Sequence, residues 1–182
     1  MKMILGIVGR RLSGKDEVSD YLVKNYQAFH IKYSNILDEI LDIIDQPKSR
    51  RNEIDIGIAM RQVFKEGVLN RAIKKKLLAS EAQLKVVNGI RFQDEFDTIL
   101  SMGGKFLYIT APHEILYQRF LARKEKADDS TLSAQEFAAL ENEPTEIKIP
   151  QLGEQCDFKI ENTGSLEELY KKIDEVIKEI KH

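Results

Sequence analysis

Two glycines and a lysine near the start of the chain have the spacing of a phosphate-binding loop. Four residues separate Gly9 from Gly14, and Lys15 follows at once. Glycines let such a loop turn its backbone N–H groups inward, and the lysine reaches the β- and γ-phosphates of a nucleotide. An apolar run at 3–8 precedes the loop and a helix-like segment follows it, which is the context this motif requires. The residues predicted to bind ATP are Gly9, Arg10, Arg11, Leu12, Ser13, Gly14, Lys15, Asp16 and Glu17.

Asp16 departs from the usual form of this loop. Ser or Thr normally follows the lysine and supplies a hydroxyl to Mg²⁺. A carboxylate in the first turn of a helix is favoured by the helix dipole, but it repels a triphosphate unless a cation lies between them. We therefore predict that Asp16 helps to hold Mg²⁺ through water. A helix-dipole residue and a degenerate site are the alternatives. If Asp16 is a bare carboxylate, removing Mg²⁺ should weaken ATP binding more than it does in Ser/Thr loops.

Composition limits the class of protein. The chain has 182 residues, enough for one domain with a sizeable core. Its 28 Lys and Arg against 30 Asp and Glu give no global basic field, which argues against a nucleic acid polymer as partner. A single cysteine, Cys156, cannot form an intrachain disulfide and is expected to pack in the core. With neither an 18-residue apolar run nor a leader segment, the sequence predicts a cytoplasmic protein without a membrane partner.

Apolar runs alternate with helical periodicity along the whole chain. Strands are predicted at 3–8, 28–31, 84–87, 106–109 and 158–160. Helices are predicted at 16–25, 35–44, 54–76, 93–102, 113–124 and 166–180. This order predicts an α/β fold with a five-stranded, mainly parallel sheet and helices on both faces, in a single domain over 1–182.

The carboxyl ends of the strands are where such sheets bind ligands. The residues that follow the predicted strands at this edge are 9–15, 33–34, 88–91, 111–112 and 162–164. Two further stretches are expected to lie over it. Residues 46–82 are predicted to form substrate-binding helices, and the charged segment 124–146 is predicted to form a small lid.

Three segments carry a resemblance to known kinases. The loop from Gly9 to Asp16 resembles those of bacteriophage deoxynucleoside monophosphate kinases and animal-type phosphomevalonate kinases, both of which have Gly-Lys-Asp. Residues 88–95 resemble the Asp-x-Arg segment of those families, and residues 160–169 are similar to their Ile-x-Asn-x-Gly-Ser-Leu-Glu-Glu-Leu ending. Dephospho-CoA kinases share that ending and the general fold. The resemblance implies a three-layer P-loop NTPase fold and a nucleoside or nucleotide kinase, but it is weak through 46–82.

The resemblance also implies roles for residues outside the loop. Asn162 and Gly164 would lie against the adenine of ATP, although an ordinary turn before a helix would use the same residue types. Asn88 stands where the related families usually have Asp. Its amide can orient a water molecule but brings no negative charge, which leaves Asp16 as the main acidic group near the metal.

Arginines at the expected edge are candidates for phosphate contacts. Arg91 follows a buried strand and is predicted to clasp a substrate phosphate, with a salt bridge to Asp94 or Glu95 as the alternative. Arg119 and Arg123 lie four residues apart, on one helix face. They are predicted to neutralise the charge on the migrating phosphoryl group, with a solvated basic face as the alternative.

The acceptor is predicted less specifically. Arg51, Arg61 and Ser34 are the remaining candidates for substrate contacts, with plain surface charge as the alternative for the two arginines. Together the residues predict transfer of the γ-phosphoryl group of ATP, with Mg²⁺, to a small phosphorylated acceptor such as a nucleoside or deoxynucleoside monophosphate. Dephospho-CoA kinase and phosphomevalonate kinase are the ranked alternatives. A non-catalytic nucleotide-binding regulator is the alternative that Asn88 suggests.

Overall fold

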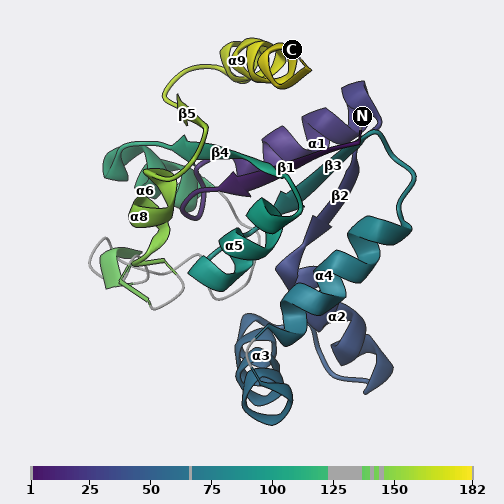
Figure 1. Cartoon of the computed structure of the whole chain (residues 1–182). Coiled ribbons are helices and arrows are strands. Elements are labelled where there is room, and N and C mark those ends of the chain that lie inside the picture. Colours follow the sequence, from purple (N-terminus) through teal and green to yellow (C-terminus); the bar gives the residue numbers. More distant parts are fainter. Residues whose placement is uncertain (1, 66, 123–136, 140–141, 144–145, 182) are drawn as a thin grey trace.

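A parallel sheet of five strands forms the centre of the molecule (Figure 1). The computed structural model describes residues 2–65, 67–122, 137–139, 142–143 and 146–181. The strands are β1 (Met3–Val8), β2 (Phe29–Lys32), β3 (Leu84–Asn88), β4 (Lys105–Thr110) and β5 (Phe158–Glu161). They lie in the order β2-β3-β1-β4-β5, and all four neighbouring pairs are parallel. The predicted sheet is confirmed, and no strand end differs from the prediction by more than one residue.

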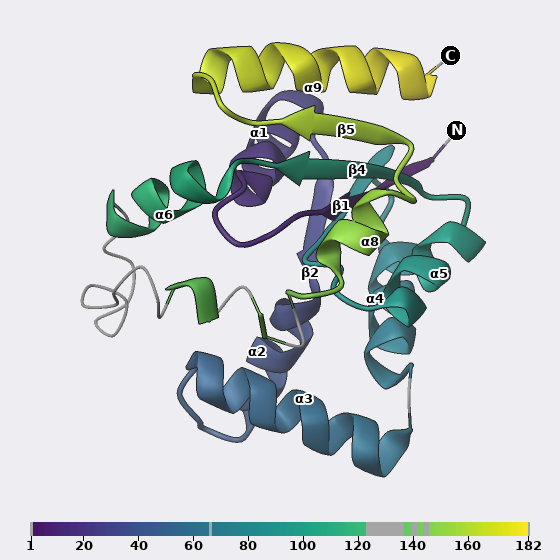
Figure 2. The same cartoon turned by 90° about the vertical axis from the view of Figure 1, so that its left-hand side faces the viewer.

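Helices cover both faces of this sheet and complete three layers. The helices with given bounds are α1 (Lys15–Tyr26), α2 (Tyr33–Ile43), α3 (Arg50–Phe64), α4 (Val68–Ala79), α5 (Gln93–Ser101), α6 (His113–Ala122), α8 (Ile149–Gly153) and α9 (Leu166–Lys181), of which α3 lies away from the sheet (Figures 1 and 2). Helices α1 and α9 lie on one face, and α4, α5 and α8 lie on the other (Figure 1). Strands joined through helices give parallel pairing, because each connection must cross over the sheet.

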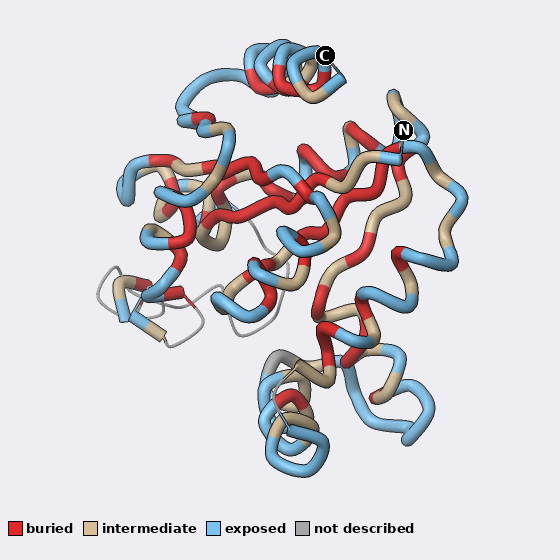
Figure 3. The backbone as a smooth tube through the Cα atoms, in the orientation of Figure 1, coloured by how far each residue is buried: buried red, intermediate tan, exposed pale blue. Residues whose placement is uncertain are grey.

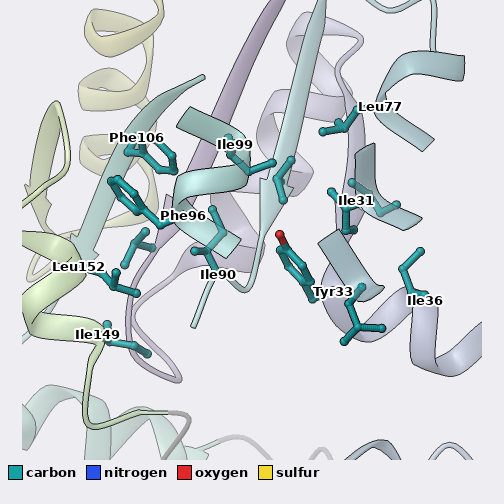
Figure 4. Packing of buried hydrophobic residues seen from close by; sticks show 14 of the residues in the cluster. Ile31, Tyr33, Ile36, Leu77, Ile90, Phe96, Ile99, Phe106, Ile149 and Leu152 are labelled. Atoms are coloured by element: carbon teal, nitrogen blue, oxygen red, sulfur yellow. The ribbon is translucent and has the colours of Figure 1, made fainter. Parts of the chain in front are cut away.

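The two faces are built by alternation along the strands. In β1, Leu5 and Ile7 pack with α1 and α9, whereas Val8 packs with the cluster under α4 and α5. Figure 3 shows the central strands as mostly buried. On the α5 side, the rings of Phe96 and Phe106 stack with centroids 3.7 Å apart (Figure 4). A Cβ at Gly6 would lie only 2.7 Å from the Phe106 ring, so this position requires glycine.

One helix prediction is wrong. The segment 54–76, expected to form one helix, is divided between α3 and α4. Lys65 and Gly67 both have positive φ, 69° and 77°, which breaks the helical backbone at that point. Helix α8 was also not predicted; it is only five residues long and starts with Pro150 in its first turn. Within the described ranges, every helix is too short or too polar to span a membrane.

Candidate phosphate-binding site

The glycine loop lies at the carboxyl edge of the sheet, between the end of β1 and the start of α1. Gly14 is the N-cap of α1 and has a φ of 104°, which favours glycine. A Cβ at Gly14 would overlap the side-chain amide of Asn162, and one at Gly9 would overlap the backbone oxygen of Ile109. Both glycines are therefore required by close approach of neighbouring segments. The predicted strand–loop–helix arrangement is confirmed.

Lys15 is buried in this loop. Its ammonium group donates a hydrogen bond to the backbone oxygen of Arg10 at 2.6 Å. Burial, and after it the nearby positive charge of Arg91, lower the pKa of Lys15 to about 7, against the opposing effect of the Glu146 and Asp16 carboxylates. A phosphate group in the loop would add negative charge beside Lys15 and restore its protonated form.

Glu146 places a buried carboxylate against the loop. One oxygen forms an ion pair with the guanidinium group of Arg91, and the other accepts the backbone N–H of Arg11 at 3.3 Å. The Glu146 side chain is only 4% exposed. Arg91 also contacts Glu95, through its backbone N–H, which donates to the Glu95 carboxylate at 2.8 Å. The negatively charged group between the loop amide of Arg11 and the guanidinium group of Arg91 is thus the protein's own Glu146 carboxylate.

The sequence did not single out Glu146, which entered only as the last residue of the predicted lid. Its partners Arg11 and Arg91 lie 135 and 55 residues away in the chain. A glutamate in a charged segment gives no local signal of such pairing. Only the fold brings it to the loop.

Asp16, in the first turn of α1, lies in a polar cluster with the last residues of two strands. Lys32, the last residue of β2, places its ammonium nitrogen 2.8 Å from Oδ1 of Asp16. Asn88, the last residue of β3, donates its amide to the same oxygen at 2.9 Å and to the Ser19 hydroxyl at 3.2 Å. Asp16 and Asn88 are therefore in direct contact. The premise of a bare Asp16 carboxylate is wrong, because Lys32 neutralises it.

This donor set fits a directly bound Mg²⁺ poorly. Mg²⁺ in phosphate sites usually takes one or two carboxylates besides phosphates and water. Here Oδ1 of the one carboxylate in the cluster already takes an ammonium group and an amide. No group of three or more His, Cys, Asp or Glu side chains placed for a metal occurs in the described ranges. The predicted role of Asp16 toward Mg²⁺ stays a prediction.

Arg119 and Asn162 hold the glycine loop from the β4–β5 side. Arg119 donates to the backbone oxygens of Leu12, at 3.2 Å, and of Asn162, at 2.9 Å. The buried amide of Asn162 donates to the backbone oxygen of Ser13 at 2.9 Å. Gly164 follows in the exposed turn before α9. The structure thus brings Arg119 and Asn162 to the loop. A contact of Asn162 and Gly164 with adenine stays a prediction.

The predicted substrate arginines lie in different surroundings. Arg61 of α3 contacts the Glu95 carboxylate at 3.2 Å, and its guanidinium carbon lies 5.1 Å from the centre of the Phe92 ring. It is therefore close to the backbone of Arg91. Arg51, in contrast, pairs with Asp55 one turn along α3 and is 83% exposed. Ser34 is half-buried in the first turn of α2, directly after β2.

Arg123 lies outside the described residues, as does most of the predicted lid. Of the segment 124–146, the structure describes 137–139, 142–143 and Glu146. Phe137 is buried against Phe120 of α6, with ring centroids 4.9 Å apart. In Figure 2, β4 and β5 point toward the side of the molecule that carries α6, so these described residues lie near the carboxyl edge of the sheet.

Cys156 fits the predicted packing role. Its thiol donates to the backbone oxygen of Leu152 at 3.4 Å, and burial raises its pKa to about 12. Such a thiol carries little thiolate at neutral pH.

Comparisons with known proteins agree with this fold. No family model matches the chain. A UPF0200 protein of Saccharolobus solfataricus is 28% identical over 179 residues, which are 97% of this chain and 92% of that protein. An adenylate kinase of Malacoplasma penetrans is 28% identical over 128 residues, covering 68% of this chain and 57% of that protein.

The similar solved structures include shikimate kinases. That of Bacteroides thetaiotaomicron has a TM-score of 0.65 at 12% identity and covers 97% of this chain and 98% of its own. That of Acinetobacter baumannii, in complex with shikimate, has a TM-score of 0.60 at 18% identity, with 100% and 96% covered. At these identities the likeness concerns the fold. The chain has the three-layer α/β P-loop NTPase fold, in the arrangement seen in P-loop kinases.

Proposed function

We propose that the protein is an ATP-dependent phosphotransferase with a small phosphorylated acceptor, for which nucleoside or deoxynucleoside monophosphates are the expected class. The observation that carries this proposal is the anion site at the loop. There, beside buried Lys15, the Glu146 carboxylate accepts a hydrogen bond from the backbone N–H of Arg11 and forms an ion pair with the guanidinium group of Arg91. A phosphate group needs the same donors.

Each residue has a part in this proposal. The loop amides and Lys15 hold the β- and γ-phosphates of ATP, and Arg91 exchanges Glu146 for the acceptor phosphate. Arg61, held near Arg91 by Glu95, adds positive charge on the acceptor side. Arg119 keeps the loop and Asn162 in place through their backbone oxygens. Alignment and charge neutralisation supply most of the rate gain in phosphoryl transfer.

A phosphorylated acceptor suits the charges at this edge better than a hydroxyl acceptor. A hydroxyl group calls for a positioned base. Glu95 uses both carboxylate oxygens, one for Arg61 and the other for the backbone N–H groups of Arg91 and Phe92. Asp16 is engaged by Lys32 and Asn88. A phosphate oxygen is already ionised and needs no base, which ranks dephospho-CoA kinase below the first proposal.

Two features of the proposal rest on the sequence alone. Helices α3 and α4, within 46–82, are the proposed substrate-binding helices, and 124–146 with Arg123 is the proposed lid. Mg²⁺, when bound with ATP, would screen the β- and γ-phosphate charges in this class of enzyme. No step above depends on the ion.

A nucleotide-binding regulator without transfer activity is the second candidate. It is favoured by the cluster at Asp16, where Asn88 is neutral and Lys32 cancels the carboxylate charge. Such a protein would bind ATP or ADP and release no product.

An acceptor panel separates these functions. The protein is incubated with ATP, with and without Mg²⁺, and with nucleoside monophosphates, deoxynucleoside monophosphates, dephospho-CoA or phosphomevalonate, and ADP release is followed. We expect a monophosphate to raise ADP formation, and Lys15→Ala to abolish the increase. Lys171→Ala, on the exposed face of α9, is the matched control. Nucleotide binding without ADP formation from any acceptor would favour the regulator.

A further inference from the structure

The position after the loop lysine carries its own counter-charge in this chain. Asp16 stands where Ser or Thr usually helps to bind the metal, and the Lys32 ammonium lies 2.8 Å from its Oδ1 atom. The Lys32 side chain is 33% exposed and that of Asp16 is 43% exposed. Both groups are therefore accessible to solvent.

Asn88 fixes the geometry of this pair. It is 1% exposed, and its amide nitrogen donates to Asp16 and to Ser19. Its Oδ1 atom is buried and has no hydrogen-bond partner among the described residues, and the same holds for the Ser13 hydroxyl of the loop. Unpartnered buried polar atoms are costly and mark places where a ligand or its water completes the bonding. Two such atoms in and beside the loop indicate a ligand site.

Lys32 has donors to offer this ligand. An ammonium group has three N–H donors, and within the described part of the chain the group it contacts is the Asp16 carboxylate. Lys32 is close enough to Lys15 for its charge to act on it. A phosphate held by Lys15 would consequently lie within the field of Lys32 as well.

We propose that the Lys32 ammonium, positioned by Asp16 and Asn88, binds the phosphates of the nucleotide and serves as a built-in cation in place of Mg²⁺. This inference rests on the proposed nucleotide site. It reverses the sequence-based expectation that nucleotide binding here depends strongly on Mg²⁺. Asp16 then acts as the positioning residue of a lysine rather than as a carrier of the metal.

Calorimetric titration with ADP and with ATP, in Mg²⁺ and in EDTA, tests the proposal. We expect the unaltered protein to keep its affinity in EDTA within about three-fold. Lys32→Met should lose roughly 10- to 100-fold in EDTA, the range for one charge-assisted contact. Lys32→Arg, which keeps the charge, should retain more affinity than Lys32→Met. Lys76→Met, which breaks a comparably exposed ion pair with Glu39, is the control.

The outcomes are distinguishable. If EDTA weakens the unaltered protein and Lys32→Met by the same factor, the built-in cation is wrong while the nucleotide site stands. The same conclusion follows if Lys32→Met and Lys76→Met bind equally in EDTA. If the unaltered protein binds neither nucleotide in either buffer, the proposed function fails and the role of Lys32 fails with it. Thermal unfolding of each variant shows whether it is folded. The comparison of nucleotide affinity in Mg²⁺ and in EDTA tests the unaltered protein even if a variant does not fold.

Discussion

At the scale of single residues, the protonation of Lys15 links nucleotide binding to pH. Burial lowers its pKa to about 7, so above that pH the unliganded loop holds mostly a neutral amine. A bound phosphate favours the ammonium form and raises the pKa again. Nucleotide binding at pH 8 should therefore take up a proton, and the uptake should shrink at pH 6, where Lys15 is already charged.

Calorimetry in buffers of different ionisation enthalpy measures this uptake. At pH 8 the nucleotide phosphates are fully ionised and release no proton of their own. We expect the observed binding enthalpy to depend on the buffer with a slope approaching one proton. An enthalpy that is the same in all buffers at pH 8 would contradict a neutral Lys15.

Glu146 predicts a second effect, on stability. Its carboxylate occupies donors that we assign to phosphate, so Glu146→Gln should destabilise the unliganded protein by about 2 kcal/mol, the scale of a hydrogen bond to a charged group. In this variant the phosphate does not have to displace a carboxylate from the Arg11 N–H and the Arg91 guanidinium group. The stabilisation that ADP gives should thus be larger in Glu146→Gln than in the unaltered protein.

Urea unfolding with and without saturating ADP checks both parts. Glu167→Gln, which removes an exposed partner of Lys171, is the control and should leave both quantities nearly unchanged. Equal stabilisation by ADP in Glu146→Gln and in the control would show that Glu146 is not in the phosphate site.

The residues of the site were predictable only where local spacing carries the information. Gly9, Gly14 and Lys15 follow from a short motif, and Arg91 follows from its place after a strand. Lys32 and Glu146 were missed, because each acts through a partner that is distant in the chain. Asp16 was found, but its ion pair with Lys32 was not. A salt bridge between the first turn of a helix and the end of a strand leaves no pattern in the sequence.

At the scale of elements, the loop is shaped by what packs behind it. Gly14 combines a left-handed backbone with direct contact to Asn162. Gly14→Ala should cost roughly 1–3 kcal/mol of stability from backbone strain, with an added cost from the clash, and should abolish nucleotide binding.

Gly103→Ala is a matched control for this prediction. Gly103 also has a positive φ, 76°, but a Cβ there would meet nothing within 4 Å. The difference between the two variants, by urea unfolding, isolates the clash with Asn162. If both variants lose the same stability and both bind nucleotide, the loop is not held in the way we describe.

Element boundaries show where periodicity stops being informative. The apolar spacing of 54–76 continues through the turn between α3 and α4, so it predicted one helix. Gly67 alone costs a helix only about 1 kcal/mol, which the apolar pattern easily outweighs when the sequence is considered alone. Lys65 carries no signal for a positive φ. Helix α8 was missed because one turn of helix has too few residues for a period to be seen.

At the scale of the whole molecule, the sheet and its layers were predictable, and the identity of the small molecule that binds at the site was not. Alternating strands and helices specify parallel pairing and two covered faces, as in the structure. The arrangement also places the start of α1 and the ends of β2 and β3 at one edge, which is why Asp16, Lys32 and Asn88 meet. Which small molecule binds there depends on side chains from segments such as 46–82, where the resemblance to the known kinase families is weak.

The proposed mechanism depends most on one exchange, in which phosphate replaces the Glu146 carboxylate at the loop. A crystal structure of the protein with a non-hydrolysable ATP analogue and a nucleoside monophosphate tests it directly. We expect phosphate oxygens on the Arg11 N–H and on the Arg91 guanidinium, with Glu146 displaced and Lys15 turned from the Arg10 oxygen to the phosphates. A pocket without nucleotide, with Glu146 still bound to Arg91 and Arg11 at saturating ligand, would contradict this mechanism.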